Sequence, residues 1–201
     1  MNEMSPLELD ALIEIFNISV GRAAACLSDL THESVSMSVP VVHFISAKRA
    51  ALFLDPDNNR NLTCVSQEFD GGFSGKAMLM FPSADSLEIV RRMLGADVPI
   101  EQLSELEQDA MSEIGNIILN SCFATIADML NNRFRCELPV LSVGYISQIL
   151  GDSCAEKQVL FLQIRLGLDE HDLEGFLVFL LGDESRHGLH QSIVKFLSGA
   201  V

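Results

Sequence analysis

The amino-acid sequence predicts an α+β fold with α/β-type layers, in which two long helices pack on a mostly antiparallel sheet. Segments of strand character follow one another in pairs joined by short turns, rather than alternating with helices. A pattern in the first half also recurs in the second, which indicates an internal repeat with pseudo-two-fold symmetry. Because half of the chain has too little helix to cover both faces of a small sheet, we expect a single domain over residues 1–201.

The repeated pattern consists of two acidic residues, an asparagine and a proline. Each member of the second set lies 99 positions after its counterpart: Asp10, Glu14, Asn17 and Pro40 are followed by Asp109, Glu113, Asn116 and Pro139. Four identities at kept spacing rarely coincide by chance. We therefore divide the chain into a first unit of about residues 5–98 and a second of about residues 104–199.

The first unit is expected to begin with a long helix from Pro6 to about Leu30. Apolar residues recur there at three- and four-residue steps, as in a helix that faces a core. Ser5 and Glu8 have the Ser-x-x-Glu spacing of a capping box, and proline suits the first helical position. This start is therefore well specified.

The rest of the first unit is predicted to be a set of strands and a closing helix. Residues 34–45 have strand character, with Pro40 at a break or bulge. Two further strands are expected over about residues 62–69 and 73–81, with Gly71-Gly72 as their hairpin turn. A short helix over about residues 84–95 ends the unit.

The second unit repeats this order. Ser104 and Glu107 form a second Ser-x-x-Glu pair, so we expect a capping box at the start of a long helix over about residues 105–131. Three strands are then predicted near residues 138–149, 158–168 and 173–181, followed by a last helix over residues 184–197.

Composition excludes several classes of partner. The net charge of −15 argues against nucleic acid or an anionic membrane, which would be repelled across most of the surface. The five cysteines are odd in number and show no Cys-x-x-Cys pair, so we expect reduced thiols and no metal site. With no leader sequence and no apolar run near the length of a membrane span, the protein is expected to be cytoplasmic.

The repeated acids and asparagines fall on one face of each long helix. Steps of four and three residues align Asp10, Glu14 and Asn17, and the surrounding residues are strongly apolar. One interpretation is that this face is merely the solvent side of a core helix. Asparagine is a poor helix former, however, and a solvent-facing position would more readily carry Lys, Gln or Glu. Its recurrence three residues after glutamate favours a functional ridge.

A carboxylate and an amide one turn apart can bind a partner's cation and orient a water molecule at the same time. The amide is too weak a base to take a proton, so it suits positioning, which is most of what phosphoryl transfer asks of a protein. The sequence near the ridges has no glycine-rich phosphate loop, metal cluster or activated nucleophile. We therefore expect another molecule to supply the phosphate and metal.

The doubled Asp-x3-Glu-x2-Asn-x22-Pro pattern resembles the CheC/CheX/FliY phosphatases of bacterial chemotaxis, and the resemblance covers essentially the whole chain. Two patterns without an appended C-terminal domain match the two-site, CheC-like type. The resemblance implies hydrolysis of the aspartyl phosphate of the response regulator CheY. Glu14 and Glu113 would pair with the lysine of CheY, and Asn17 and Asn116 would orient the attacking water. No cofactor would be bound by this chain, because Mg²⁺ would be carried by the phosphorylated partner.

The remaining motif residues, Asp10, Pro40, Asp109 and Pro139, are interpreted as structural. The resemblance makes the deamidase CheD a further candidate partner, and we expect a monomer. The first ridge continues to Gly21 and the second to Asn120, and Phe16 precedes the first asparagine where Gly115 precedes the second. These differences leave open a difference in activity between the two sites.

The sequence is also compatible with other functions. A CheC-like adaptor could bind phosphorylated response regulator or CheD without turnover, and a structural part of the flagellar switch is a weaker alternative. His187 and His190 are spaced to share a metal, but no third ligand is evident, so a solvated pair is favoured.

Overall fold

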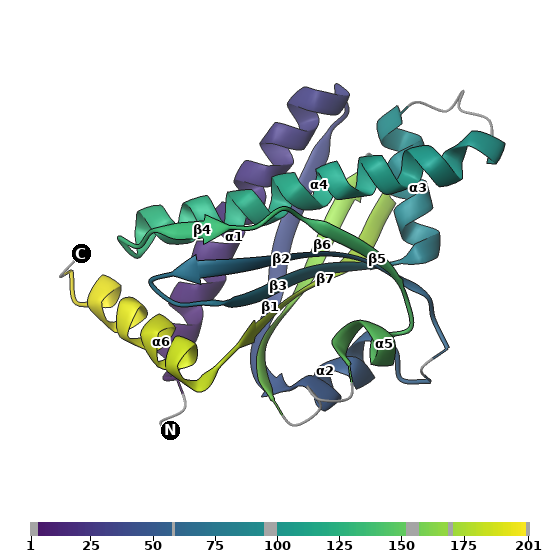
Figure 1. Cartoon of the computed structure of the whole chain (residues 1–201). Helices are drawn as coiled ribbons and strands as arrows, with labels where there is room; N and C mark the ends of the chain where they lie inside the picture. The colour runs from purple at the N-terminus through teal and green to yellow at the C-terminus, as the bar shows by residue number, and fades with distance from the viewer. Residues whose placement is uncertain (1–3, 58, 95–99, 152–156, 169–170, 200–201) are drawn as a thin grey trace.

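The computed structural model describes residues 4–57, 59–94, 100–151, 157–168 and 171–199 (Figure 1). In the first half the elements are α1 (Pro6–Thr31), β1 (Val35–Ser46), α2 (Ala47–Leu54), β2 (Leu62–Gly71), β3 (Gly75–Pro82) and α3 (Ser83–Leu94). In the second half they are α4 (Ile100–Met129), β4 (Phe134–Cys136), β5 (Val140–Gly144), α5 (Ile146–Leu150), β6 (Gln158–Leu168), β7 (His171–Leu181) and α6 (Asp183–Leu197). The two halves have the same order, with β4 and β5 in the place of β1.

All strands of the described chain belong to one sheet, in the order β1-β6-β7-β3-β2-β4, with β5 also paired to β2. Every pairing is antiparallel, which confirms the predicted α+β class. The centre is the β3–β7 pair, where Met78 lies opposite Val178. The edge strands are exchanged, since β1 pairs with β6 and both β4 and β5 pair with β2. Each half therefore completes the sheet of the other.

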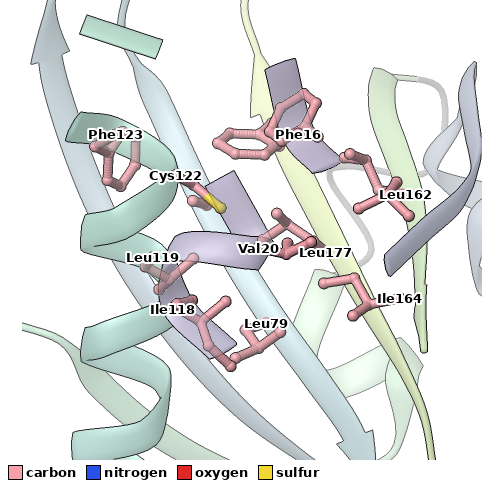
Figure 2. Packing of buried hydrophobic residues seen from close by; sticks show 14 of the residues in the cluster. Phe16, Val20, Leu79, Ile118, Leu119, Cys122, Phe123, Leu162, Ile164 and Leu177 are labelled. Atoms are coloured by element: carbon pink, nitrogen blue, oxygen red, sulfur yellow. The ribbon is translucent and has the colours of Figure 1, made fainter. Parts of the chain in front are cut away.

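The sheet is buried on both faces. On one face α1 and α4 pack over residues such as Val65, Leu79 and Leu162, and α6 adds Leu189 to the same core. Figure 2 shows side chains of α1 and α4 meeting those of the sheet in this core. On the other face α2 and α5 cover a second core that contains Met78. Because neighbouring strand residues point to opposite faces, the central strands are apolar at successive positions.

The start of α1 is capped as predicted. The Ser5 backbone N–H donates to Glu8 Oε2 at 2.7 Å, and the Glu8 N–H donates to Ser5 Oγ at 3.4 Å. The hydrogen bond from the Ser5 backbone lowers the pKa of the Glu8 carboxyl. Glu8 also accepts from His190 Nε2 of α6 at 3.2 Å. The stability contributed by this carboxylate is complete above its ordinary pKa and is lost as the pH falls through the lowered value.

Several predictions for the second half are wrong. α4 begins at Ile100, so Ser104 and Glu107 lie inside the helix and not at its cap. The good helix formers before Ser104 extend the helix beyond the expected start. The strand predicted over residues 138–149 is short, and residues 146–150 form α5. In the first half, the helix α2 was not predicted either, because segments this short carry too little periodicity to be recognised.

The predicted irregularity at Pro40 is confirmed. β1 continues through this residue, but its register with β6 shifts between Ser38, opposite Arg165, and Val41, opposite Gln163. Proline has no N–H to donate to a neighbouring strand, so the ladder is interrupted there. The origin of the two halves by duplication, and the unit boundaries at 98 and 104, stay predictions; residues 95–99 lie outside the described chain.

The composition and length of α1 would also suit a membrane-spanning helix. In the fold, however, its apolar side chains lie in the core; Leu12, Ile15 and Val20 are at most 1% exposed. The packing of α1 against the sheet and against α4 therefore accounts for its apolar character (Figure 1).

The two long helices contact the sheet in different ways. Phe16 of α1 places its ring 5.5 Å from the ring of Phe179 on β7. At Gly115 of α4, a Cβ atom would lie 2.5 Å from side-chain atoms of Val65 on β2. Glycine therefore lets α4 lie directly on β2 beside Asn116, which explains why the residues before the two asparagines differ so much in size.

Ser5→Ala should lower the free energy of unfolding by about 1 kcal/mol, because it leaves the first turn of α1 without its side-chain acceptor. Urea denaturation would measure the loss. Ser104→Ala, inside α4, is the control and should cost nothing, since alanine is a better helix former than serine. Equal effects of the two substitutions would contradict the capping assignment.

Gly115→Ala should destabilise the protein by about 1–3 kcal/mol, because the added methyl group forces α4 away from β2. Gly21→Ala is the matched control in α1, where a Cβ meets no atom within 4 Å. That change should be neutral or stabilising by up to about 1 kcal/mol. Thermal unfolding of both variants measures the difference, and a stable Gly115→Ala protein would rule out the close contact.

Candidate functional site

The predicted ridge residues all lie at the surface of α1 and α4. Glu14 and Glu113 are exposed, as are Asp10 and Asp109, and the two asparagines are half-buried. The side chains on either side of the ridges are buried in the main core: Leu12, Ile15, Phe16, Ile114, Ile118 and Leu119. Figure 2 shows Phe16, Ile118 and Leu119 within that core. Each helix therefore presents a polar ridge that a visiting protein can reach.

The two helices that carry the ridges are joined directly. Arg22 of α1 donates from one guanidinium nitrogen to Thr125 Oγ1 at 3.2 Å and to Asp128 Oδ2 at 3.4 Å, both on α4. Thr125 is fully buried, so one of these contacts lies at the packed helix interface. The exposed ion pair with Asp128 contributes little by itself. Both ridges consequently belong to one helical layer.

Asn17 has a structural bond that the sequence did not reveal. Its Oδ1 accepts a hydrogen bond from the backbone N–H of Val39 at 2.8 Å, which ties α1 to β1. Val39 lies within the register shift next to Pro40, so its N–H is directed to the helix while the regular ladder is interrupted. This bond gives a physical reason for the spacing between asparagine and proline in the first copy of the motif.

Asn116 is held in another way. Its Oδ1 accepts from Asn120 Nδ2 at 2.8 Å, one turn further along α4. The strand that corresponds to β1 is divided here, since β4 ends at Cys136 and β5 begins at Val140. Between them Leu138 is 86% exposed. The second asparagine is therefore anchored to its own helix, whereas the first is anchored to the sheet.

The break between β4 and β5 is stabilised from β2. The Glu137 N–H donates to the Glu68 carbonyl at 2.9 Å, and the buried Gln67 side chain donates to the Glu137 carbonyl at 2.7 Å. Pro139 is half-buried within this break. The second proline thus also marks a strand irregularity. Among the described residues, however, no backbone N–H of this break donates to Asn116.

The carboxylates of the ridges remain available. Among the described residues, Glu14 and Glu113 form no hydrogen bond or ion pair, and neither do Asp10 and Asp109. The structural role that the sequence suggested for the two aspartates therefore stays a prediction. Exposed carboxylates without a partner can accept a lysine from another protein. An amide one turn away can direct a water molecule, because each amide oxygen retains a second lone pair.

Other reactive groups do not form a competing site in the described part of the chain. No group of three or more His, Cys, Asp or Glu side chains there is arranged to hold a metal ion. Burial raises the pKa of the Cys64 and Cys122 thiols to about 12, so neither is a nucleophile at neutral pH. His187 contacts Gln191 while His190 contacts Glu8, so the two histidines have separate partners.

No family model matches the chain, but its sequence is similar to two known phosphatases. The chain is 22% identical over 158 residues to the CheY-P phosphatase CheC of Bacillus subtilis. The aligned region covers 77% of this chain and 75% of that protein. The chain is 23% identical over 176 residues to the flagellar motor switch phosphatase FliY of the same organism, covering 86% of this chain and 45% of FliY. These relatives support the prediction that the chain is of the CheC/FliY type.

Solved structures agree with this family in fold. The crystal structure of Thermotoga maritima FliY has a TM-score of 0.78 at 20% identity, with 97% of this chain and 100% of that chain covered. The CheX–CheY–BeF3–Mg²⁺ complex of Borrelia burgdorferi has a TM-score of 0.53 at 15% identity, covering 85% of this chain and 97% of that chain. Both structures confirm the predicted fold. The roles of single CheC/FliY-type motif residues stay predictions.

Asn17→Ala should destabilise the fold by about 1–3 kcal/mol, because it leaves the buried Val39 N–H without its acceptor. Asn116→Ala breaks only an exposed bond to Asn120 and should cost less than about 0.5 kcal/mol. Denaturant unfolding of the two variants, measured side by side, checks this difference. Equal costs would show that the Val39 bond contributes nothing specific.

Proposed function

We propose that this CheC/FliY-type protein is a phosphatase that accelerates hydrolysis of the aspartyl phosphate of a CheY-like response regulator. The named activities of its relatives support the proposal at the level of the family. Its fold is shared with a CheX that was crystallised with CheY. The observation that carries the proposal is the pair of exposed, unpartnered carboxylates, each one turn from an anchored amide.

In this mechanism Glu14 and Glu113 recognise the partner. Each carboxylate forms an ion pair with the lysine beside the phosphorylated aspartate, which places the helix ridge against the phosphoryl group. Docking removes water from this pair and strengthens it relative to an exposed one. Since the net charge of −15 gives little long-range attraction to an acidic phosphorylation site, short-range contacts of this kind must determine the docked orientation.

Asn17 and Asn116 act on the attacking water. A rigid helix carries each amide into the partner's site, where the amide aligns a water molecule with the phosphorus atom. Positioning of this kind needs no proton transfer to the amide and suits the weak basicity of asparagine. The partner carries the phosphoryl group and the Mg²⁺ that neutralises its charge, so this chain itself binds no cofactor.

The same proposal includes the setting in which the protein acts. We expect a cytoplasmic monomer whose main partner is the phosphorylated regulator, with CheD as a second candidate. Asp10, Pro40, Asp109 and Pro139 support the helices and following strands and take no part in the chemistry. Of these four, Pro40 has the clearest basis, because the register shift beside it accompanies the bond between Val39 and Asn17.

The test is the lifetime of phosphorylated CheY in the presence of catalytic amounts of the protein. Replacing both Asn17 and Asn116 with alanine should slow hydrolysis by roughly 10²- to 10³-fold, the range for loss of a positioned polar group. Because Asn17→Ala also weakens the fold, Glu14→Ala with Glu113→Ala provides a second double variant at exposed, unbonded positions. Lys48→Ala, at an exposed position of α2 on the opposite face of the sheet, is the surface control. Full activity in both double variants would reject the proposal.

A non-catalytic adaptor is the second candidate. The different anchoring of the two asparagines favours it, since two sites selected for the same turnover would be expected to keep the same support. An adaptor would bind the phosphorylated regulator but leave its phosphate lifetime unchanged at low molar ratios. Shortening of that lifetime by substoichiometric protein excludes an adaptor without turnover.

A further inference from the structure

Asn120 lies one helical turn after Asn116 and is the only neighbour that holds its amide oxygen among the described residues. Given the proposed phosphatase function, we propose that Asn120 is a positioning residue of the second site. It acts through Asn116 and makes no contact with the reacting atoms. At the equivalent position the first ridge has Gly21, which has no side chain to offer.

The need for such a residue follows from the shape of an amide. An asparagine side chain can turn by half a rotation and exchange its oxygen for its nitrogen at almost no cost in shape. A fixed donor at the oxygen selects one of the two orientations. At the first site that donor is the backbone N–H of Val39, which can only donate. At the second site the same selection has to come from elsewhere.

Among the described residues, no backbone N–H of the strand donates to Asn116 at the second site. β4 and β5 are separated by residues 137–139, and the Glu137 N–H is directed to the Glu68 carbonyl of β2. Leu138, which corresponds to Val39, is 86% exposed where Val39 is 1% exposed. The side-chain donor is thus present in the copy where the backbone donor is lost, and absent where the backbone donor is kept.

The hydrogen bond from Asn120 is expected to affect the turnover rate more than the binding of the partner protein. With its oxygen partly occupied by Asn120, Asn116 presents a defined edge to an incoming water molecule. Docking of a partner would exclude solvent around this exposed pair and strengthen the bond between the two amides. Loss of Asn120 should therefore lower kcat through misoriented Asn116 amides, while contacts that set KM, such as that of Glu113, are unchanged.

The experiment uses a Glu14→Ala background, so that hydrolysis of phosphorylated CheY reports the second site. In it, Asn120→Ala should lower kcat by about three- to tenfold with KM unchanged, the range for one neutral hydrogen bond. Asn120→Gln keeps an amide donor and should restore most of kcat. Asn120→Asp keeps the shape but offers an acceptor, which turns the Asn116 amide around, so kcat should be at least as low as with alanine.

A control separates this effect from others. Ala124→Asp places the same charge at an exposed position one turn further along α4 and should not lower kcat.

The outcomes distinguish the two proposals. Parental kcat in Asn120→Ala, or equal kcat in the Gln and Asp variants, would overturn the positioning role while leaving phosphatase activity intact. If the phosphatase proposal itself is wrong, the wild-type protein will not shorten the phosphate lifetime, or Asn116→Ala will have no effect in the Glu14→Ala background.

Discussion

The structure depends on the constraint that two long helices must bury their apolar sides against the sheet and against each other. α1 and α4 pack on the sheet and on each other, and their ridge carboxylates lie on the sides that face solvent. Exchange of the edge strands makes this burial possible, because each half completes the sheet beneath the other. A polar group on such a ridge is held by a rigid, buried scaffold, which is what a positioning site requires.

The same constraint explains why the two sites are not equal. Where α4 packs directly on β2 at Gly115, the neighbouring chain is divided into β4 and β5, and among the described residues the donor to Asn116 is Asn120. Where Phe16 fills the space under α1, β1 stays continuous and donates Val39 N–H to Asn17. The two copies thus fix the orientation of the asparagine amide with different hydrogen-bond donors.

Much of the outline was accessible from residue patterns. Helical periodicity predicted α1 within one residue at its end, and the Ser5 and Glu8 capping box was found as expected. The same capping pattern failed at Ser104, because strong helix formers before it extend α4 to Ile100. α2 and α5 were missed since their stability comes from packing over the second core, and local periodicity over so few residues is weak.

By itself the sequence determined the class of fold, the two helices, the position of the strand irregularity at Pro40 and the residues that share each ridge. These follow from spacing, which local geometry converts directly into a helix face or a strand break. Only the tertiary structure decided which strands are neighbours and which atom holds each asparagine. The partner of Asn17 lies 22 residues away in another element, and that of Asn116 is its own helix neighbour. Such choices depend on how closely helix and sheet pack, a property of the assembled chain.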